Sequence, residues 1–465
     1  MSVSHESLAA LLEGDPNDVV VHAHDQATTR AELRSTVDAL AARLREASLE
    51  RKTVGVLAPN GPDAIAAWFA VWRVGGAFVP LNPRVPAAER ERAIASTGVA
   101  AVIEPPAVRL QSDTPPRPVE PGEAIIQFTS GTTGQPKPVP LHHRTVLALL
   151  DGVIGSLRAP QPGDAGERRA PMPNLVPVSL SLWAGIYQVL FAFRLGAPVV
   201  LMERFEPREF ARLVREFGIR SSVLPPAAMV MLADDAAVES LEPLRYVRSV
   251  SAPLSPIQAR RFHDRFGVAI LNGYGQTELG GEVVGWTAAD WKQFGAAKLG
   301  AVGRPHAGIE VRVRDDELQV RSASTKPAGE LGDRLTADGW LRTGDLARID
   351  DDGFVWIDGR VSAMVNRGGL KVFPDEVEEH LRAYPGVADA AVAGVPDERL
   401  GEVPWAFLVV APNAHVDADA LREWCRGRMA AYKVPAGITV IDALPRNEIG
   451  KLLRQELVPL ARVDR

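Results

Sequence analysis

The sequence predicts an α/β protein with a large N-terminal domain of doubly wound, mostly parallel sheets plus a small β-barrel subdomain, and a small α+β C-terminal domain. Three observations carry this prediction. In the first half of the chain, short apolar runs alternate with segments of helical periodicity, as in βα units. Residues 310–314 and 317–321 alternate in polarity, which indicates antiparallel strands. Residues 360–465 have an α/β pattern of their own.

The apolar runs of the first half predict its strands, at residues 53–58, 100–103, 124–128, 199–202, 221–224 and 247–250. Pro62 begins a helix after the turn Asn60-Gly61. Four large apolar residues follow at helical spacing, and we expect them in the core rather than around a ligand. They are Ile65, Trp68, Phe69 and Trp72.

The change of pattern along the chain also predicts the domain boundaries. The large domain is expected over residues 1–359, with the barrel subdomain at about 285–355, and the small domain over 360–465. The joint falls at Gly359-Arg360. In the small domain we expect helices at 374–382 and 418–429 and strands at 388–393 and 406–410.

Composition excludes broad classes only. With 52 basic and 58 acidic residues the net charge is −6, which gives no reason to expect a nucleic-acid partner. The single cysteine, Cys425, cannot form an internal disulfide or a CxxC metal knuckle, so a reducing cytoplasm is expected. The uncharged run at 172–193 contains prolines and polar residues, so we expect a buried helix beginning near Val178 and no membrane span.

The most informative local pattern is the loop Thr129-Ser130-Gly131-Thr132-Thr133-Gly134-Gln135-Pro136-Lys137. Its glycines let backbone N–H groups turn inward, its hydroxyls add donors, and Lys137 adds positive charge, which suits a polyphosphate. The loop is not a Walker motif, because Lys137 follows a proline. Taken alone, it also fits a surface turn.

A second pattern, Asn272-Gly273-Tyr274-Gly275-Gln276-Thr277-Glu278, follows an apolar run. Tyr274 between glycines can offer an aromatic face to a base, and Glu278 can bind Mg²⁺ through its carboxylate. The alternative for this segment alone is a glycine-rich turn with a solvated glutamate.

Three further segments carry charged residues beside tight turns, and Asp345 in the first is placed to accept both hydroxyls of a ribose. Alone, they also fit a capped turn, an ordinary helix start and an exposed basic residue. The segments are Trp340 to Asp345, Asp358-Gly359-Arg360 with Arg367 to Glu378, and Pro445 to Arg454, which contains Gly450-Lys451.

In this order, the five patterns resemble the adenylate-forming superfamily of acyl-CoA synthetases, luciferases and peptide-synthetase adenylation domains, and the chain is most like an AMP-forming acyl-CoA synthetase. The resemblance covers nearly the whole chain. It implies that a carboxylate attacks the α-phosphate of ATP to give acyl-AMP, and that a thiol, usually of CoA, then displaces AMP. It also implies a small C-terminal domain that rotates between the two half-reactions.

The resemblance implies a role for each matching residue. The loop from Thr129 to Lys137 would hold the β- and γ-phosphates, Thr277 the α-phosphate and Glu278 the Mg²⁺. Lys451 would bridge the carboxylate and the α-phosphate. Ser251, Ala252, Pro253 and Tyr274 would flank adenine, and Asp345 and Arg360 would hold the ribose. Gly273, Gly275 and Gln276 would also belong to the cofactor site.

The sequence departs from the family pattern at several positions. Pro138 replaces a glycine, and Leu175 and Val176 stand where an aromatic residue and a histidine usually gate the acyl pocket. No acidic residue lies between Glu167 and Glu203, which argues against an α-amino acid. We expect a hydrophobic acid of aliphatic, alicyclic or aryl type, with Gly280-Gly281 at the pocket floor.

The hinge between the two expected domains and the thiol that accepts the acyl group leave alternative functions open. Two residues after Arg360, where relatives usually have Asp or Lys, this chain has Ser362, followed by Ala363. Lys371, Arg367 and Arg454 are candidates for CoA phosphates or are solvated cations. Enzymes that load a carrier-protein thiol, or that convert a supplied acyl-adenylate, therefore stay as alternatives. The sequence names neither the acid, the pathway nor the oligomeric state.

Overall fold

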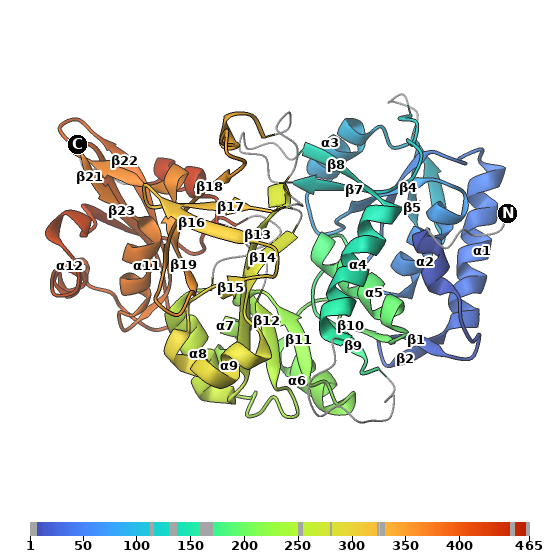
Figure 1. The fold of residues 1–465 in the computed structure, drawn as a ribbon, viewed down its shortest axis with the longest axis horizontal. Helices are drawn as coiled ribbons and strands as arrows, with labels where there is room; N and C mark the ends of the chain where they lie inside the picture. The colour runs from blue at the N-terminus through green and yellow to red at the C-terminus, as the bar shows by residue number, and fades with distance from the viewer. Residues whose placement is uncertain are drawn as a thin grey trace. The chain divides into compact units, whose positions relative to one another are not determined.

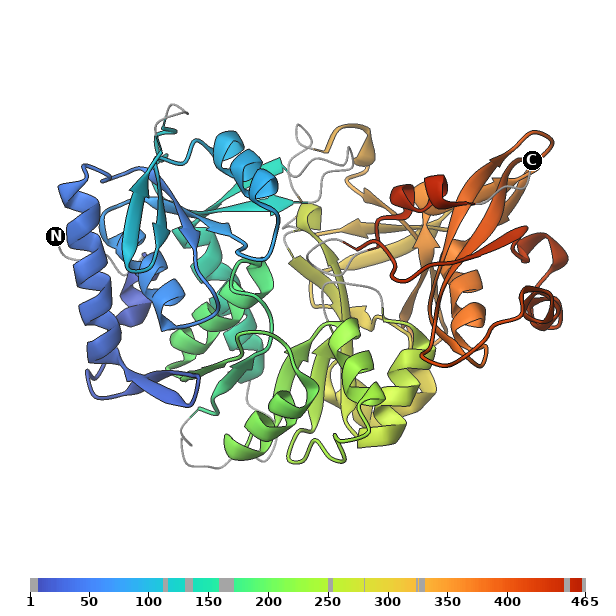
Figure 2. The same cartoon turned by 180° about the vertical axis from the view of Figure 1, so that it is seen from behind.

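The structure is a computed structural model, and it describes residues 7–111, 116–129, 137–158, 171–249, 254–279, 281–322, 325, 331–446 and 452–461. The chain forms two compact units. Unit 1 comprises Met1–Val223 and Asp235–Leu244, and unit 2 comprises Leu224–Asp234 and Arg245–Arg465. Figures 1 and 2 show the elements of both units from two sides.

Unit 1 contains a six-stranded sheet whose order is β6-β5-β3-β4-β7-β8. The four middle strands run parallel, and β6 and β8 are antiparallel edges. The strands are β3 (Thr53–Leu57), β4 (Ala77–Leu81), β5 (Ala101–Glu104), β6 (Ala107–Leu110), β7 (Glu123–Thr129) and β8 (Lys137–His142). The parallel centre confirms the doubly wound pattern expected for this part of the chain.

A second sheet of unit 1 has the order β2-β1-β10-β9, and helices complete the unit (Figure 1). Its strands are β1 (Val19–Ala23), β2 (Gln26–Thr29), β9 (Asn174–Val176) and β10 (Val199–Leu201). The helices are α1 (Arg30–Glu46), α2 (Pro62–Arg73), α3 (Ala87–Thr97), α4 (His143–Arg158), α5 (Trp183–Leu195) and α6 (Pro207–Glu216).

Helix α2 lies at the centre of the unit 1 core. All residues from Ala64 to Trp72 are buried. The ring of Trp68 stacks on Phe78 of β4 with centroids 5.4 Å apart. This confirms that the aromatic stripe predicted from the sequence is core, because a ligand box would leave ring faces uncovered.

The helix expected to begin near Val178 begins at Trp183. The side chain of Asn60 is the physical reason. Its Nδ2 donates to the carbonyl of Val178 at 2.9 Å, and its Oδ1 accepts the N–H of Leu180 at 2.7 Å. These bonds hold the backbone of Val178 and Leu180 in a turn, so the helix begins only after this turn. Among the described residues, no helix is long and apolar enough to cross a membrane.

The chain passes from unit 1 to unit 2 within β11 (Ser221–Leu224), and α7 (Pro226–Asp234) follows. In unit 2, β12 and β13 run parallel, whereas β14 and β15 are antiparallel additions. The elements are β12 (Tyr246–Ser249), α8 (Pro256–Phe266), β13 (Ala269–Gln276), β14 (Gly281–Gly285), α9 (Ala288–Phe294) and β15 (Arg304–Pro305).

An antiparallel sheet of order β16-β17-β18-β19 follows in unit 2. Its strands are β16 (Glu310–Arg314), β17 (Glu317–Arg321), β18 (Leu341–Ile349) and β19 (Val355–Arg360). The first two have the bounds expected from the alternating pattern. The expected barrel at about 285–355 and the boundary at 359–360 stay predictions.

The last sheet of unit 2 has the order β21-β20-β23-β22, with β24 parallel to β23 (Figure 1). Its elements are β20 (Val365–Arg367), β21 (Leu370–Val372), α11 (Pro374–Arg382), β22 (Val387–Asp397), β23 (Gly401–Val410), α12 (Ala418–Arg426) and β24 (Gly437–Val440). The α/β class is thus confirmed across the chain.

Candidate active site

Asp345 is the centre of a polar cluster in unit 2. It lies on β18 with only 2% of its surface exposed, and its Oδ1 is 2.7 Å from Nε of Arg360. The two residues are also register partners in the β18–β19 ladder. An isolated carboxylate is costly to bury, and this ion pair offsets part of that cost for Asp345.

Two side chains of β13 complete the bonds to Asp345. The hydroxyl of Tyr274 donates to Oδ2 at 2.6 Å, and Nε2 of Gln276 lies 2.6 Å from the same oxygen. Burial raises the pKa of the Tyr274 phenol well above its usual value, and the charge of Asp345 adds to this effect. Tyr274 is therefore a neutral hydrogen-bond donor, and its ring is fixed beside the carboxylate.

The sequence Thr343-Gly344-Asp345 explains the position of this carboxylate. Oγ1 of Thr343 donates to the carbonyl of Leu318 at 2.7 Å and accepts the N–H of Asp345 at 3.1 Å. Gly344 has a φ of +75°, a conformation that favours glycine, and its N–H donates to Glu317 at 2.8 Å. Each residue of the predicted motif therefore has a structural task.

Glu278 lies in the short 3-10 turn η2 (Thr277–Leu279) that follows β13. Its Oε1 is 2.7 Å from Nη1 of Arg334, whose Nη2 donates to Oε1 of Gln276 at 3.0 Å. Sequence reasoning missed Arg334, because it belongs to no motif and only the fold brings it to η2. It links the Glu278 carboxylate to the Asp345 cluster.

The donor set around Glu278 fits Mg²⁺ bound together with a nucleotide. Magnesium in such sites takes one or two carboxylates, and phosphate and water oxygens supply the rest. Within the described residues, no group of three or more His, Cys, Asp and Glu side chains gathers to hold a metal alone. The single carboxylate of Glu278 matches a site in which the protein, the phosphates and water each supply ligands to the metal.

The predicted phosphate loop belongs to unit 1. Its first and last residues, Thr129 and Lys137, are register partners at the ends of β7 and β8, so the motif connects two antiparallel strands. Several predicted residues lie outside the described part of the chain, as do the side chains of Thr129, Lys137 and Thr277. They are Ser130, Gly131, Thr132, Thr133, Gly134, Ser251, Ala252, Pro253 and Lys451.

The three basic residues considered for CoA phosphates have different surroundings. Lys371 is exposed, with its Nζ 4.0 Å from Asp316. Arg367 donates to the carbonyl of Tyr432 at 2.8 Å. Arg454 pairs with Asp375 and Glu378 and is therefore not a solvated cation. Lys371 keeps the most accessible charge of the three.

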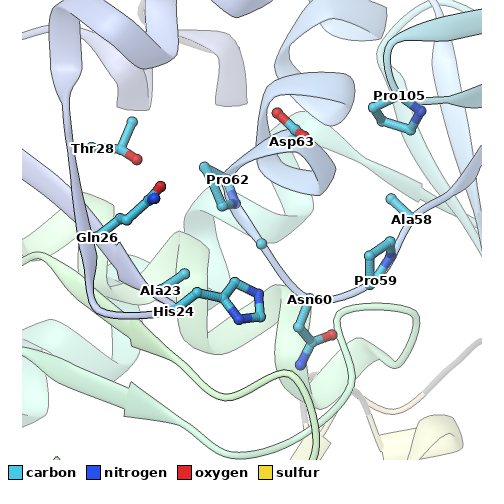
Figure 3. A pocket seen from close by; sticks show the side chains of 11 residues that line it. Ala23, His24, Gln26, Thr28, Ala58, Pro59, Asn60, Pro62, Asp63 and Pro105 are labelled. Atoms are coloured by element: carbon cyan, nitrogen blue, oxygen red, sulfur yellow. The ribbon is translucent and has the colours of Figure 1, made fainter.

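A separate cavity of about 310 Å³ lies in unit 1 between the β1–β2 turn and the start of α2 (Figure 3). His24, Pro62 and Asp63 are among the residues around it. Its Asn60 already bonds Val178, Leu180 and Met202. None of the predicted site residues lines this cavity, so we do not assign the site there.

The chain is similar to known proteins over nearly its whole length. The family model described as "AMP-binding enzyme" matches residues 8–120 and 104–332, and "AMP-binding enzyme C-terminal domain" matches 376–451. A feruloyl-CoA synthase of Amycolatopsis sp is 31% identical, covering 95% of this chain and 96% of that protein. A fatty acid–[acyl-carrier-protein] ligase of Streptomyces coeruleorubidus is 31% identical over 82% of this chain and 75% of that protein.

Two solved structures also resemble the chain, each over 97% of its length. The amide bond synthetase McbA from Marinactinospora thermotolerans has a TM-score of 0.78 and 28% identity, covering 97% of this chain and 99% of its own. The Bacillus subtilis o-succinylbenzoate coenzyme A synthetase in complex with ATP and magnesium ion has a TM-score of 0.79 and 24% identity, covering 97% and 98%. The second likeness concerns the fold alone. The chain therefore belongs to the AMP-binding enzyme family, the adenylate-forming superfamily that its motifs indicate, and it is an enzyme of that family's acid–thiol ligase group.

Proposed function

We propose that this protein is an AMP-forming acyl-CoA synthetase. It activates a hydrophobic carboxylic acid with ATP to an acyl-adenylate and pyrophosphate, and it transfers the acyl group to CoA. The observation that carries the proposal is the buried Asp345 carboxylate, held by Arg360 at 2.7 Å and by Tyr274 at 2.6 Å. A fixed acceptor beside an aromatic ring is what a nucleoside requires.

The nucleoside is held by the cluster around Asp345. The carboxylate accepts the ribose hydroxyls, and Arg360 pairs with it. The ring of Tyr274, between Gly273 and Gly275, faces adenine. Ser251, Ala252 and Pro253 flank adenine together with Tyr274, and Gln276 belongs to the same cofactor site.

The phosphates are held by residues that neutralise charge. The loop Thr129 to Lys137 takes the β- and γ-phosphates, Thr277 the α-phosphate, and Glu278 the Mg²⁺. When bound, Mg²⁺ neutralises phosphate charge and so permits attack by an anion. Lys451 bridges the attacking carboxylate and the α-phosphate, and the two anions keep its ammonium protonated.

The acyl acceptor is CoA, with Lys371 as a candidate for its phosphates. We propose the domain boundary at Gly359-Arg360, giving domains of 1–359 and 360–465. Arg360 therefore lies both in the ribose site and at the joint. Neither Ser362 nor Ala363 fixes φ as proline would, so rotation at this joint stays available.

The acid is mainly apolar. The stretch between Glu167 and Glu203 contains no acidic residue, and within it Leu175 and Val176 of β9 are fully buried. Nothing there pairs with a substrate ammonium group. We place the enzyme in the cytoplasm, since its one cysteine, Cys425, forms no internal disulfide.

A carrier-protein thiol is the second candidate acceptor, and the relative named as a fatty acid–[acyl-carrier-protein] ligase favours it. A third variant converts a supplied acyl-adenylate to the thioester without making it. Pro138 favours this variant, because proline removes one N–H donor next to the phosphate loop.

One experiment separates these functions. The protein is incubated with ATP, Mg²⁺ and a panel of carboxylic acids, with and without CoA, and AMP and thioesters are followed by mass. Thioester and AMP that form together only with CoA support the proposal. Acyl-AMP that accumulates regardless of CoA supports a carrier partner. An enzyme that makes no adenylate but converts added acyl-AMP to thioester supports the third variant.

A further inference from the structure

Three charged or titratable side chains meet in unit 2 outside the Asp345 cluster. Arg248 of β12 donates to Glu282 of β14 through Nε at 3.1 Å and through Nη2. His306, directly after β15, places its Nε2 2.9 Å from Oε1 of the same carboxylate. The sequence motifs contain none of these residues. We call Arg248, Glu282 and His306 the polar triad.

Two glycines make the triad possible. Arg248 and Glu282 stand on either side of β13, and their side chains meet above Gly273. A Cβ at Gly273 would lie 2.5 Å from Oε2 of Glu282, and a Cβ at Gly285 would clash with the Glu282 carboxylate and the His306 ring. The absence of a Cβ at Gly273 and at Gly285 therefore leaves the space that the side chains of the polar triad occupy.

The triad and Tyr274 lie on opposite faces of β13. Successive residues of a strand point to opposite faces, so Gly273 and Tyr274 face apart. The Tyr274 face carries the bonds to Asp345. In the proposed function, the face of β13 that carries Tyr274 binds the nucleotide. The opposite face, which carries Gly273, then remains available for the carboxylic acid, whose carboxylate must reach the α-phosphate.

We propose that the polar triad is a subsite that binds an oxygen substituent on the acid, remote from its reacting carboxylate. This inference rests on the proposed function and sharpens it: the preferred substrate is a mainly apolar acid with one hydroxyl or ketone group. The side chains are accessible to a ligand, since 36% of Arg248, 26% of Glu282 and 37% of His306 is exposed.

The hydrogen-bonding capacity of the triad matches that substituent. Burial disfavours the charge of Glu282, but hydrogen bonds from His306 and Arg248 lower its pKa below the usual value. The Glu282 charge therefore balances that of Arg248. Within the described residues, Nη1 of Arg248 and Nδ1 of His306 have no protein partner. A neutral oxygen can accept from Arg248 without adding an unbalanced charge.

The test is acid-dependent exchange of pyrophosphate into ATP, measured with pairs of acids. Benzoate and phenylacetate are each compared with their ring-hydroxylated derivatives, and cyclohexanecarboxylate is compared with its ring-hydroxylated and ring-ketone derivatives. The variants are Arg248→Met, which removes the donors, and Arg248→Lys, which keeps the charge. Arg321→Met is the matched control, because Arg321 pairs with Glu310 across neighbouring strands of the same unit.

The readout is the ratio of kcat/KM for the oxygenated acid to that for its unsubstituted partner. The wild-type enzyme is expected to favour one oxygenated acid, and Arg248→Met to lower this ratio by about tenfold, the scale of one hydrogen bond to a charged group. Arg248→Lys should retain part of the preference, and Arg321→Met all of it.

Two results would overturn the inference alone. One is equal exchange with both members of every pair in the wild-type enzyme. The other is an Arg248→Met variant that loses exchange with both members equally, as a purely structural residue would. Absence of exchange with every acid would instead overturn the proposed function, and this inference with it.

Discussion

Arg360 and Asp345 are joined twice, once by backbone pairing of β18 with β19 and once by a 2.7 Å contact between Nε and Oδ1. The ladder fixes the position of both side chains, and the ion pair fixes their orientation. A ligand that binds Asp345 therefore meets an acceptor already in place. In the proposed nucleotide site, this arrangement would limit the entropy that binding must overcome.

The first prediction concerns Asp345→Asn. We expect the KM for ATP to rise about tenfold to a hundredfold, because a charged acceptor of two ribose hydroxyls is lost. Asp338→Asn is the control, since Asp338 pairs with Arg312 and is 57% exposed in the same unit. Equal KM values for the two variants would argue against a ribose site at Asp345.

The second prediction concerns Lys451→Ala. Adenylation, measured as pyrophosphate exchange into ATP, should fall by at least about 10²-fold, the usual scale for one preorganised charge contact. Lys292→Ala, at an exposed position, should leave exchange unchanged. The role assigned to Lys451 is wrong if its variant keeps exchange within a few-fold of wild type.

The sequence predicts the Asp345 cluster better than it predicts the residues around it. The cluster is predictable because Asp345, Arg360 and Tyr274 each lie in a contiguous motif. The chemistry of each motif can be inferred from its own residues. Arg334 and the polar triad come from separate elements with ordinary composition. Their meeting depends on strand register, which local patterns do not specify.

The same limit applies to the fold. The sequence predicts the helix at 374–382 with its observed bounds, because Pro374 marks its start and the apolar positions repeat. The sequence predicts a start for α5 about five residues before the observed one at Trp183. The cause is a tertiary contact. The side chain of Asn60, which is distant in sequence, forms hydrogen bonds with the backbone of Val178 and Leu180.

The third prediction compares two glycine substitutions on β13. In Gly273→Ala the new Cβ meets only the end of the Glu282 side chain, which can move, so the free energy of unfolding should change by less than about 1 kcal/mol. In Gly275→Ala it meets the Gly281 backbone, so a loss of roughly 1–3 kcal/mol is expected.

Thermal unfolding measures both variants. Gly273→Ala should also alter the preference between oxygenated and unsubstituted acids, because Glu282 must move away from Arg248. A Gly273→Ala enzyme as unstable as Gly275→Ala would show that the Glu282 side chain is held too firmly to yield.

The fourth prediction concerns Glu378, which is 3% exposed on α11. It accepts the N–H of Val392 at 2.8 Å and pairs with Arg382 at 3.1 Å and with Arg454. Glu378→Gln removes the most buried of the carboxylates that pair with these two arginines, so the free energy of opening β22 at Val392 should fall by about 3 kcal/mol. Hydrogen exchange at Val392 measures this loss directly.

Glu423→Gln is the matched control for Glu378→Gln. Glu423 pairs with Arg426 on α12, but 74% of its side chain is exposed, and exposed pairs contribute little. Unchanged exchange at Val392 in Glu378→Gln would show that Asp375 and Asp389 alone balance the two arginines.

The fifth prediction is a pH dependence of stability in unit 1. Burial, aided by the neighbouring His142, lowers the pKa of His143 from 6.5 to about 4, and its Nδ1 accepts the N–H of Leu8 at 3.1 Å. Between these two values the unfolded chain binds a proton that the folded chain does not. Stability should therefore fall as the pH drops from 6.5 towards 4.

His143→Gln removes this proton-binding difference and should flatten the fall in melting temperature between about pH 7.5 and about pH 5. His415→Gln, at an exposed position, should keep the wild-type slope. The two variants share the chemical change and differ in burial. A slope that is the same in His143→Gln and in wild type would mean that folding does not exclude the proton from His143.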